Sequence, residues 1–265
     1  MNYFFGIFDS IQRGGTDSDA ASFFARVTAA GGSLTATEKT AINTLVLSLK
    51  ANSLWTRMYA IYPMVGASAA SCAQNLVSSS YTGTFSGGIT YASTGVTPNG
   101  TNAYMNTNLN GLSVLNKSNI HYAIYPRTNT SVGADIGITD NNTGSFEIYA
   151  RHPNGNTYYE NGSVPLFVAV ANSLGLYIGS TIANNNHNLY KNGSSIISSV
   201  AVNNINFFNG NIYLFAMLNI QGGVPLLYTN REQAYSSIGL GLSSAQASAY
   251  YTIIQTFQTS LSRQV

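Results

Sequence analysis

The stretch TPNGTNAYMNTNL, residues 97–109, contains the two signals that decide the fold. Its first four residues, TPNG, predict a tight turn, because proline and the Asn-Gly pair favour turn conformations. Residues 103–107 then predict a β-strand, in which successive side chains alternate between two faces. Tyr104 and Asn106 are expected on one of those faces. The segment therefore predicts a turn followed by a strand rich in asparagine and free of charge.

The same combination of Asn-Gly turns and uncharged strand-like segments recurs along most of the chain. Asn-Gly pairs stand at 99, 110, 154, 161, 192 and 209, and this pair favours the type I′ turn of a β-hairpin. Many short strands separated by such turns predict a mainly β fold, an antiparallel β-sandwich or jelly roll. The expected strands are 119–125, 144–150, 164–170, 174–180, 194–200, 211–218 and 225–229.

Helices are expected at the two ends of this β region. Asp17 or Ser18 can cap a first helix, and Thr35 and Glu38 form a capping box that begins a second. A third apolar segment, 54–62, also has a helical pattern and stops at a proline. A second capping-box sequence predicts a closing helix over 243–262.

Three regions follow from this pattern. Residues 1–15 form an aromatic arm, 16–62 an N-terminal α-helical anchoring or oligomerisation module, and 63–265 the β-sandwich with its closing helix. An exposed apolar cluster on a terminus favours docking to a partner, although the arm could instead fold back on its own core. The residues expected to dock are Tyr3, Phe4, Phe5, Ile7 and Phe8.

The composition limits the classes of partner. Only 8% of the 265 residues are charged and the net charge is +2, against roughly 25% charged residues in an average domain. Lysine and arginine do not cluster, so nucleic-acid binding is not expected. No apolar stretch is long enough to span a bilayer, so no membrane insertion is expected. An uncharged polar surface suits an assembly or sugar contacts, or a secreted β-protein.

Candidate catalytic and metal-binding groups are sparse. A glycosidase needs two carboxyl groups about 5–10 Å apart, and the sandwich offers Asp135, Asp140, Glu147, Glu160 and Glu232 without the acid-x-acid pattern of glucanases. Glu147 shares a predicted strand face with Tyr149. We predict no catalytic site, metal or cofactor, although the 140–144 loop has oxygens that could meet Ca²⁺. Cys72 is expected to be buried, and His152 and His187 to lie at the surface.

Sugar binding is the better-supported alternative chemistry, since a sugar ring has one apolar face and many hydroxyl groups. Tyr158, Tyr159 and Tyr190 are the candidate glycan contacts. The competing interpretation is that these tyrosines are half-buried cross-strand partners.

Several stretches resemble structural proteins of tailed bacteriophages that infect gut Bacteroidota, the crAss-like phages among them. AINTLVLSLKANSLWTRMYAIYPMVGASAASCAQNL (41–76) is similar to a recurring module of those proteins. TPNGTNAYMNTNLN (97–110), LYKNG (189–193) and SIGLGLSSAQASAYYTIIQTFQTSLSRQV (237–265) resemble the concanavalin-like, LamG-type jelly roll attached to it. The chain departs from that pattern at 239–241, where the family often has an acidic residue between the two glycines.

The resemblance implies a non-enzymatic virion protein, a head fibre or decoration protein on the outer surface of the particle, made in the cytoplasm of the bacterial host. It implies a homo-oligomer, a dimer or trimer, with capsid or fibre chains as partners. The alternative is a tail adhesin that recognises host surface glycans. A depolymerase would require a carboxylate pair and is the least favoured hypothesis.

Overall fold

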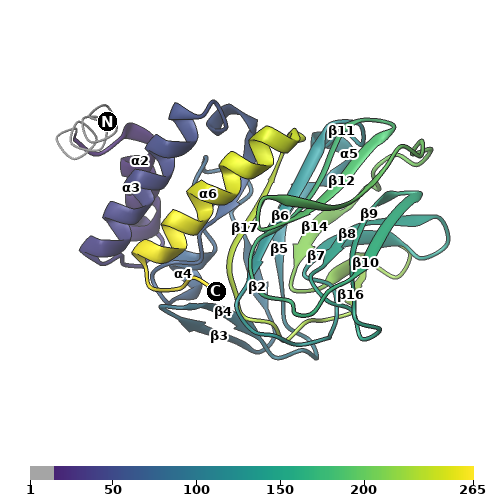
Figure 1. Ribbon diagram of the computed structural model, residues 1–265. Helices are drawn as coiled ribbons and strands as arrows, with labels where there is room; N and C mark the ends of the chain where they lie inside the picture. Colours follow the sequence, from purple (N-terminus) through teal and green to yellow (C-terminus); the bar gives the residue numbers. More distant parts are fainter. Residues whose placement is uncertain (1–14) are drawn as a thin grey trace, which may run out of the picture.

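A computed structural model describes residues 15–265, which fold into two stacked β-sheets with long helices over one of them (Figure 1). The predicted mainly β sandwich with helices at both ends is confirmed. Nearly all strand pairs are antiparallel, the exception being β15 with β7. The expected docking residues of the arm, Tyr3 to Phe8, lie outside the described residues.

The sheet beneath the helices, here called the covered sheet, is buried on both faces at its centre. Its central strands β6 (Ile120–Pro126) and β17 (Gln233–Gly239) are buried along their whole length, as expected where one face meets a core and the other meets helices. The remaining strands of this sheet are β13 (Ser194–Ser199), β12 (Asn186–Lys191), β11 (Tyr177–Ala183), β4 (Gly95–Pro98), β3 (Ile89–Ala92) and β1 (Met58–Tyr62).

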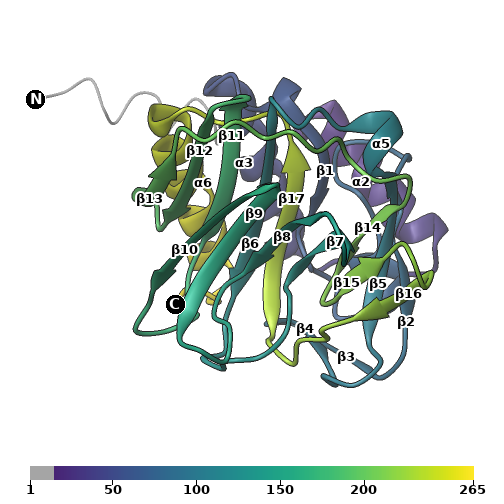
Figure 2. The same cartoon turned by 90° about the vertical axis from the view of Figure 1, so that its right-hand side faces the viewer.

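The second sheet, here called the open sheet, turns its outer face away from the long helices (Figures 1 and 2). Its strands alternate between buried and partly exposed positions, as in β5 and β9, the pattern of a sheet with one solvated face. In spatial order its strands are β10 (Val164–Ala169), β9 (Asn156–Gly162), β8 (Gly144–Tyr149), β7 (Ile136–Asp140), β14 (Asn211–Leu214), β5 (Tyr104–Asn110) and β2 (Thr84–Ser86), with β15 (Met217–Asn219) and β16 (Val224–Leu226) beside β7.

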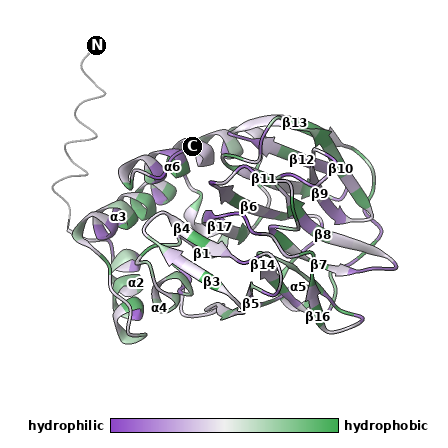
Figure 3. Cartoon of the chain, turned by 90° about the horizontal axis from the view of Figure 1, so that it is seen from below, coloured by the Kyte–Doolittle hydropathy of each residue, from purple (hydrophilic) through white to green (hydrophobic). Residues whose placement is uncertain are grey.

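Two apolar layers hold the three-layered structure together. Phe146, Tyr159 and Ile212 belong to the cluster between the sheets, and Leu45 and Phe257 belong to the cluster between the helices and the covered sheet. Burying each such side chain contributes about 1.5–3 kcal/mol. Helices α2, α3 and α6 carry apolar and polar residues on different sides (Figure 3), so their apolar sides form the second cluster.

The helices begin at the expected caps. Helix α2 (Ser18–Ala29) begins after Asp17, whose side chain accepts a hydrogen bond from a backbone N–H of the first turn. Both capping boxes are present, at the starts of α3 (Ala36–Ala51) and α6 (Ser244–Ser260). The short helices are η1 (Trp55–Arg57), α4 (Ala69–Cys72) and α5 (Gly111–Val114).

The helical interpretation of residues 54–62 is wrong. After the single turn η1 the chain becomes strand β1, which pairs with β17. Ala60 and Tyr62 reach the core between the sheets, while Met58 and Ile61 reach the cluster under the helices. A strand serves both layers in this way, so residues 16–62 fold as part of the same unit as the sandwich. An anchoring role for this segment stays a prediction.

The Asn-Gly pairs have different structural roles. Asn192 and Gly193 both have positive φ, 49° and 78°, and form the expected two-residue hairpin turn between β12 and β13. The pair in TPNG instead joins β4 of the covered sheet to β5 of the open sheet. There Asn99 Oδ1 accepts hydrogen bonds from the backbone N–H groups of residues 101 and 102. This turn therefore connects the two sheets of the sandwich.

Candidate functional site

Two rows of side chains cross the outer face of the open sheet, which faces the viewer in Figure 2. The strand register places the first row across β7 to β10 and the second across β8 to β10. The rows lie two residues apart along the strands, roughly 7 Å. The acidic row consists of Gly137, Glu147, Glu160 and Pro165, and the aromatic row consists of Tyr149, Tyr158 and Phe167.

An open hollow of about 320 Å³, here called the acidic hollow, lies over the acidic row. Three of the described residues that line it are acidic and none is basic. Tyr149 of the aromatic row is also part of its wall, so the two rows meet there. The lining residues are Thr139, Asp140, Asn141, Gly144, Ser145, Glu147, Tyr149, Glu160, Met217 and Leu227.

Glu147 is the most deeply placed of these carboxyl groups. Its side chain is 6% exposed, and its Oε2 atom is buried without a hydrogen-bond partner among the described residues. Gly137 on the next strand makes this placement sterically feasible, because a Cβ there would come within 2.8 Å of the Glu147 Cβ. Burial, and secondarily the neighbouring Glu160, raise the pKa of Glu147 well above its usual range.

Glu160 faces Glu147 directly across the β8–β9 pair. It accepts one hydrogen bond, 3.3 Å long, from the backbone N–H of Ser145, and burial raises its pKa as well. A glycosidase separates the pKa values of its two carboxyl groups, so that one acts as an acid and the other stays ionised. Here burial shifts both values in the same direction. The structure thus supplies a pair of facing carboxyl groups whose pKa values are both raised.

The aromatic row forms a partly exposed surface beside the hollow. Tyr158 stacks on Phe167, with ring centroids 5.5 Å apart, and Phe167 is 51% exposed. The rings of Tyr149 and His152 contact Tyr158 edge-on. Asn154 Nδ2 donates a 2.6 Å hydrogen bond to the Tyr158 hydroxyl. The surface therefore combines aromatic rings with amide and hydroxyl groups.

Of the three tyrosines predicted to contact a glycan, Tyr158 lies on this surface, and the assignment of the other two is wrong. Tyr159 points into the core, where its hydroxyl hydrogen-bonds to Thr181 Oγ1 at 2.8 Å. Tyr190 is buried below α6 and hydrogen-bonds to Ser244 Oγ at 3.1 Å. Tyr159 is buried because successive residues of a strand face opposite sides of the sheet, and its neighbour Tyr158 faces outward. Sequence reasoning missed Phe167. Its position two residues after Pro165 places both residues on the same face of a strand, and a proline within a strand indicates an edge strand.

The other acidic candidates have structural roles. Asp135 is fully buried in an ion pair with Arg231, at 2.7 Å. Glu232 pairs with Arg127 at 3.0 Å. Neither carboxylate is available for chemistry in the hollow. Asp140 lines the hollow, and one of its oxygens accepts a hydrogen bond from Gln221 Nε2 at 2.7 Å.

The histidines and the cysteine add no second site. His187 is fully buried, which makes its expected surface position wrong, and its Nδ1 lies 2.8 Å from Thr181 Oγ1. Cys72 is buried as predicted. Across residues 15–265 no group of three or more His, Cys, Asp and Glu side chains is arranged to hold a metal ion. The helices found in that range are too short or too polar to cross a membrane.

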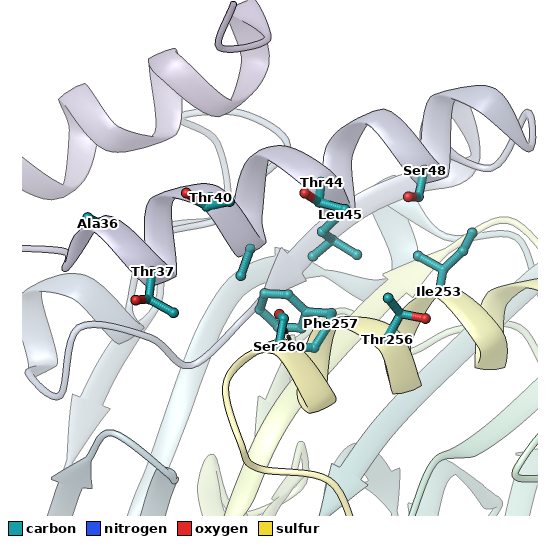
Figure 4. Close-up of a pocket in the computed structure, with 11 residues that line it drawn as sticks. Ala36, Thr37, Thr40, Thr44, Leu45, Ser48, Ile253, Thr256, Phe257 and Ser260 are labelled. Atoms are coloured by element: carbon teal, nitrogen blue, oxygen red, sulfur yellow. Dashed lines mark hydrogen bonds between the residues drawn. The ribbon is translucent and has the colours of Figure 1, made fainter. Parts of the chain in front are cut away.

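A second concavity, here called the helical groove, lies between α3 and α6 (Figure 4). These helices lie on the side of the molecule away from the outer face of the open sheet (Figure 1). Its volume is about 460 Å³. Leu45, Ile253 and Phe257 supply apolar surface, and small residues and threonines make up the remainder. The lining residues are Ala36, Thr37, Thr40, Ala41, Thr44, Leu45, Ser48, Ile253, Thr256, Phe257 and Ser260. The groove is thus uncharged, unlike the acidic hollow.

Comparison with solved structures agrees on the β-sandwich fold. Domain 4 of AbnA, a GH43 extracellular arabinanase from Geobacillus stearothermophilus in complex with arabinotriose, is similar with a TM-score of 0.53 and 15% identity, over 73% of this chain and 98% of that one. A mutant Trypanosoma rangeli sialidase has a TM-score of 0.53 and 8% identity, with 82% of this chain and 39% of that one covered. The botulinum neurotoxin serotype D binding domain has a TM-score of 0.50 and 12% identity, with 76% of this chain and 52% of that one covered.

Sequence comparison adds no family assignment. No protein-family model matches the chain, and no match was found among curated proteins. At these identities the structural similarities describe the fold alone, so any activity must be argued from the site itself.

Proposed function

We propose that this protein is a non-enzymatic, glycan-binding structural component of a bacteriophage virion, displayed on the outer surface of the particle. The observation that carries the glycan-binding part is the aromatic row beside a polar hollow, on the sheet face that the long helices leave open. One face of a sugar ring is apolar and packs on aromatic rings, while its hydroxyl groups need hydrogen-bonding partners. Both kinds of surface are adjacent here.

The similar structures support a binding role. One is a domain described in complex with arabinotriose and another is a toxin binding domain. The low charge of this chain, 8% of residues, supports contact with the hydroxyl groups of sugars, because few charged groups need to be desolvated.

The virion part of the proposal rests on the resemblance of residues 41–76 and 237–265 to phage structural proteins. The arrangement of layers is compatible with it, since the helices and the open sheet lie on opposite sides of the molecule (Figure 1). Attachment to a capsid or fibre chain through the helical side would leave the open sheet facing outward. A head fibre or decoration protein and a tail adhesin are both accommodated by this orientation.

For the homo-oligomer we propose one contact, in which the helical groove takes the aromatic arm of a second copy. The groove lining is uncharged, and the arm carries five large apolar residues. The described structure begins at Gly15, and Asp17 contacts Asn43 and Lys50 of α3. Helix α3 also forms one wall of the groove. A dimer or trimer would follow from reciprocal or cyclic exchange.

Glycan binding is tested by titrating the purified full chain with neutral oligosaccharides and measuring the heat of binding. Tyr158→Ala and Phe167→Ala should each weaken binding by about tenfold or more, since stacked aromatic side chains supply much of the contact area. Tyr251→Ala is the matched control, because Tyr251 lies on the outer side of α6. Unchanged affinity in both row variants would contradict the proposed surface.

The virion assignment is tested by immunogold labelling of intact purified particles. Label over the head supports a fibre or decoration protein, label at the tail tip supports the adhesin, and unlabelled particles would overturn the assignment. The oligomer is tested by native mass of the chain lacking residues 1–14 and of Thr44→Arg, both expected to be monomeric. Removing residues 1–62 is unsuitable, because it deletes β1 from the covered sheet.

A further inference from the structure

The acidic hollow contains a polar atom that the protein itself leaves without a partner. Glu147 is only 6% exposed, and its Oε2 atom accepts no hydrogen bond from the described residues. Leaving a buried carboxyl group unsatisfied costs free energy. Glu147 is one of the residues that line the hollow, so a ligand there would lie beside its carboxyl group.

The pairing of Glu147 with Glu160 adds a second cost. Two carboxyl groups directly opposite each other on neighbouring strands cannot both ionise without destabilising the sheet, and these two residues are direct cross-strand partners. Neither forms an ion pair among the described residues, whose ion pairs involve other carboxylates. Glutamine or threonine would fit both strands without this repulsion. The two carboxyl groups are therefore unexplained by the stability of the fold.

The charge balance of the hollow indicates which ligand group would complement it. Asp140, Glu147 and Glu160 line it, and no lysine, arginine or histidine does. A group that brings a positive charge favours the ionised form of both carboxyl groups and gives charge-assisted hydrogen bonds, which are the stronger kind. An acidic sugar would add a further negative charge.

An ammonium group fits this lining better than a free metal ion does. Ca²⁺ requires six to eight oxygen ligands, and no group of three acidic or other metal-ligating side chains in residues 15–265 has the arrangement of a metal site. An ammonium group has three donors, which two carboxyl groups and a hydroxyl such as that of Ser145 can accept. Tyr149 also lines the hollow, and an aromatic wall further favours a cation.

We infer that the acidic hollow is a subsite for an amino sugar whose amino group is free and protonated, with the adjoining sugar residues lying along the aromatic row. This inference rests on the proposed glycan-binding function and specifies its ligand class. The subsite prefers cationic glycans to acidic ones. It also prefers them to N-acetylated glycans, in which the amide has no charge.

The test compares three probes on the full chain by calorimetry at neutral pH: a glucosamine oligomer, the N-acetylglucosamine oligomer of equal length, and a sialylated oligosaccharide. The glucosamine oligomer should bind roughly ten- to 100-fold more tightly than the acetylated one, the range of a hydrogen bond to a charged group. The sialylated probe should bind more weakly than either.

Glu147→Gln and Glu160→Gln should each remove most of this preference, so that the glucosamine and acetylated oligomers bind each variant with similar affinity. Asp19→Asn is the charge-matched control, since Asp19 lies on α2 beside Lys50. Both glutamine variants should fold, with a melting temperature equal to or above that of the parent, because each removes one member of the repelling pair.

Other outcomes would overturn the inference in distinguishable ways. Equal affinity for the charged and acetylated oligomers, or a preference that survives both glutamine substitutions, would contradict the subsite and leave glycan binding intact. A melting temperature raised by CaCl₂ alone in the parent, but not in Glu147→Gln, would assign the hollow to a free metal ion. Absence of binding to every sugar tested would refute the proposed function and this inference together.

Discussion

The hydroxyl of Tyr250 on α6 donates a 2.7 Å hydrogen bond to Ser237 Oγ on β17. Ser237 in turn lies 3.1 Å from Nε2 of His121. Nδ1 of that histidine lies 2.7 Å from the carbonyl oxygen of Leu240, which can only accept, so Nδ1 carries the proton. Tyr235 extends the chain by a 2.6 Å bond to the Tyr250 hydroxyl. A continuous buried hydrogen-bond chain therefore joins the closing helix to the covered sheet.

Stability should fall in acid because His121 is held neutral in this chain. Burial lowers its pKa from 6.5 to about 4. Between those values the unfolded chain takes up a proton that the folded chain does not, so stability falls as the pH drops below 6.5 and levels off below about 4. The loss reaches about 3 kcal/mol.

Urea unfolding at a series of pH values measures this loss. In the His121→Gln variant, which keeps a donor and an acceptor, that part of the pH dependence should vanish. Burial also lowers the pKa of His187, so some acid sensitivity should remain in the variant. Identical slopes for the parent and His121→Gln would contradict the assignment.

Replacing Arg231 should destabilise the protein strongly. Its guanidinium makes two hydrogen bonds to Asp135, of 2.8 and 2.7 Å, and further bonds to the carbonyl oxygens of Thr130, Gly133 and Arg151. Arg231→Met leaves a buried carboxylate unpaired, at a cost of about 3–5 kcal/mol.

Chemical denaturation checks this prediction, with a double variant as the control. Adding Asp135→Asn to Arg231→Met removes the stranded charge and should recover part of the loss, which a double-mutant cycle quantifies. A single-variant loss below about 1 kcal/mol would mean that the pair is replaceable by apolar packing.

Gly137→Ala should damage both stability and the acidic hollow. The added Cβ would come within 2.8 Å of the Glu147 Cβ and 2.9 Å of the Phe146 carbonyl oxygen, so β7 and β8 must shift, at a cost of about 1–3 kcal/mol. Glycan affinity should fall with it, because Glu147 moves.

Gly222→Ala is the control for this substitution. Its nearest neighbour would lie 3.3 Å away, on the Val224 side chain, so little change in melting temperature is expected. Full glycan affinity in a folded Gly137→Ala protein would show that the position of Glu147 is not critical.

The predictable parts of the fold were those with local signals. Capping boxes specify α3 and α6 because a side chain and a backbone N–H three residues apart satisfy each other, whatever the rest of the chain does. Strand β17 had no such signal. Its sequence QAYSSIG is rich in polar residues, and Gln233 donates to Asp135 while Ser237 bonds to Tyr250, so these two polar side chains depend on partners in other elements.

Part of the candidate site could also be predicted from the sequence, for a related reason. Glu147 and Tyr149 were expected to share a strand face, and they do. Pairing Glu147 with Glu160 required the β8–β9 register, and β9 was missed because the Asn161-Gly162 pair looked like a complete turn. In the structure Asn161 is still paired, with Val164, and the hairpin loop consists of the two residues between them.

The opposed placement of the helices and the open sheet has a consequence for how strongly a particle would adhere. Copies attached through their helical sides would present their acidic hollows and aromatic rows in the same direction. Each copy then raises the local concentration of sites for the next, and linked weak sites can exceed a single site by about 10²–10⁴ in overall avidity. A dissociation constant of about 1 mM for each copy would then be enough to hold a whole particle on a glycan coat, although each single contact forms and breaks rapidly.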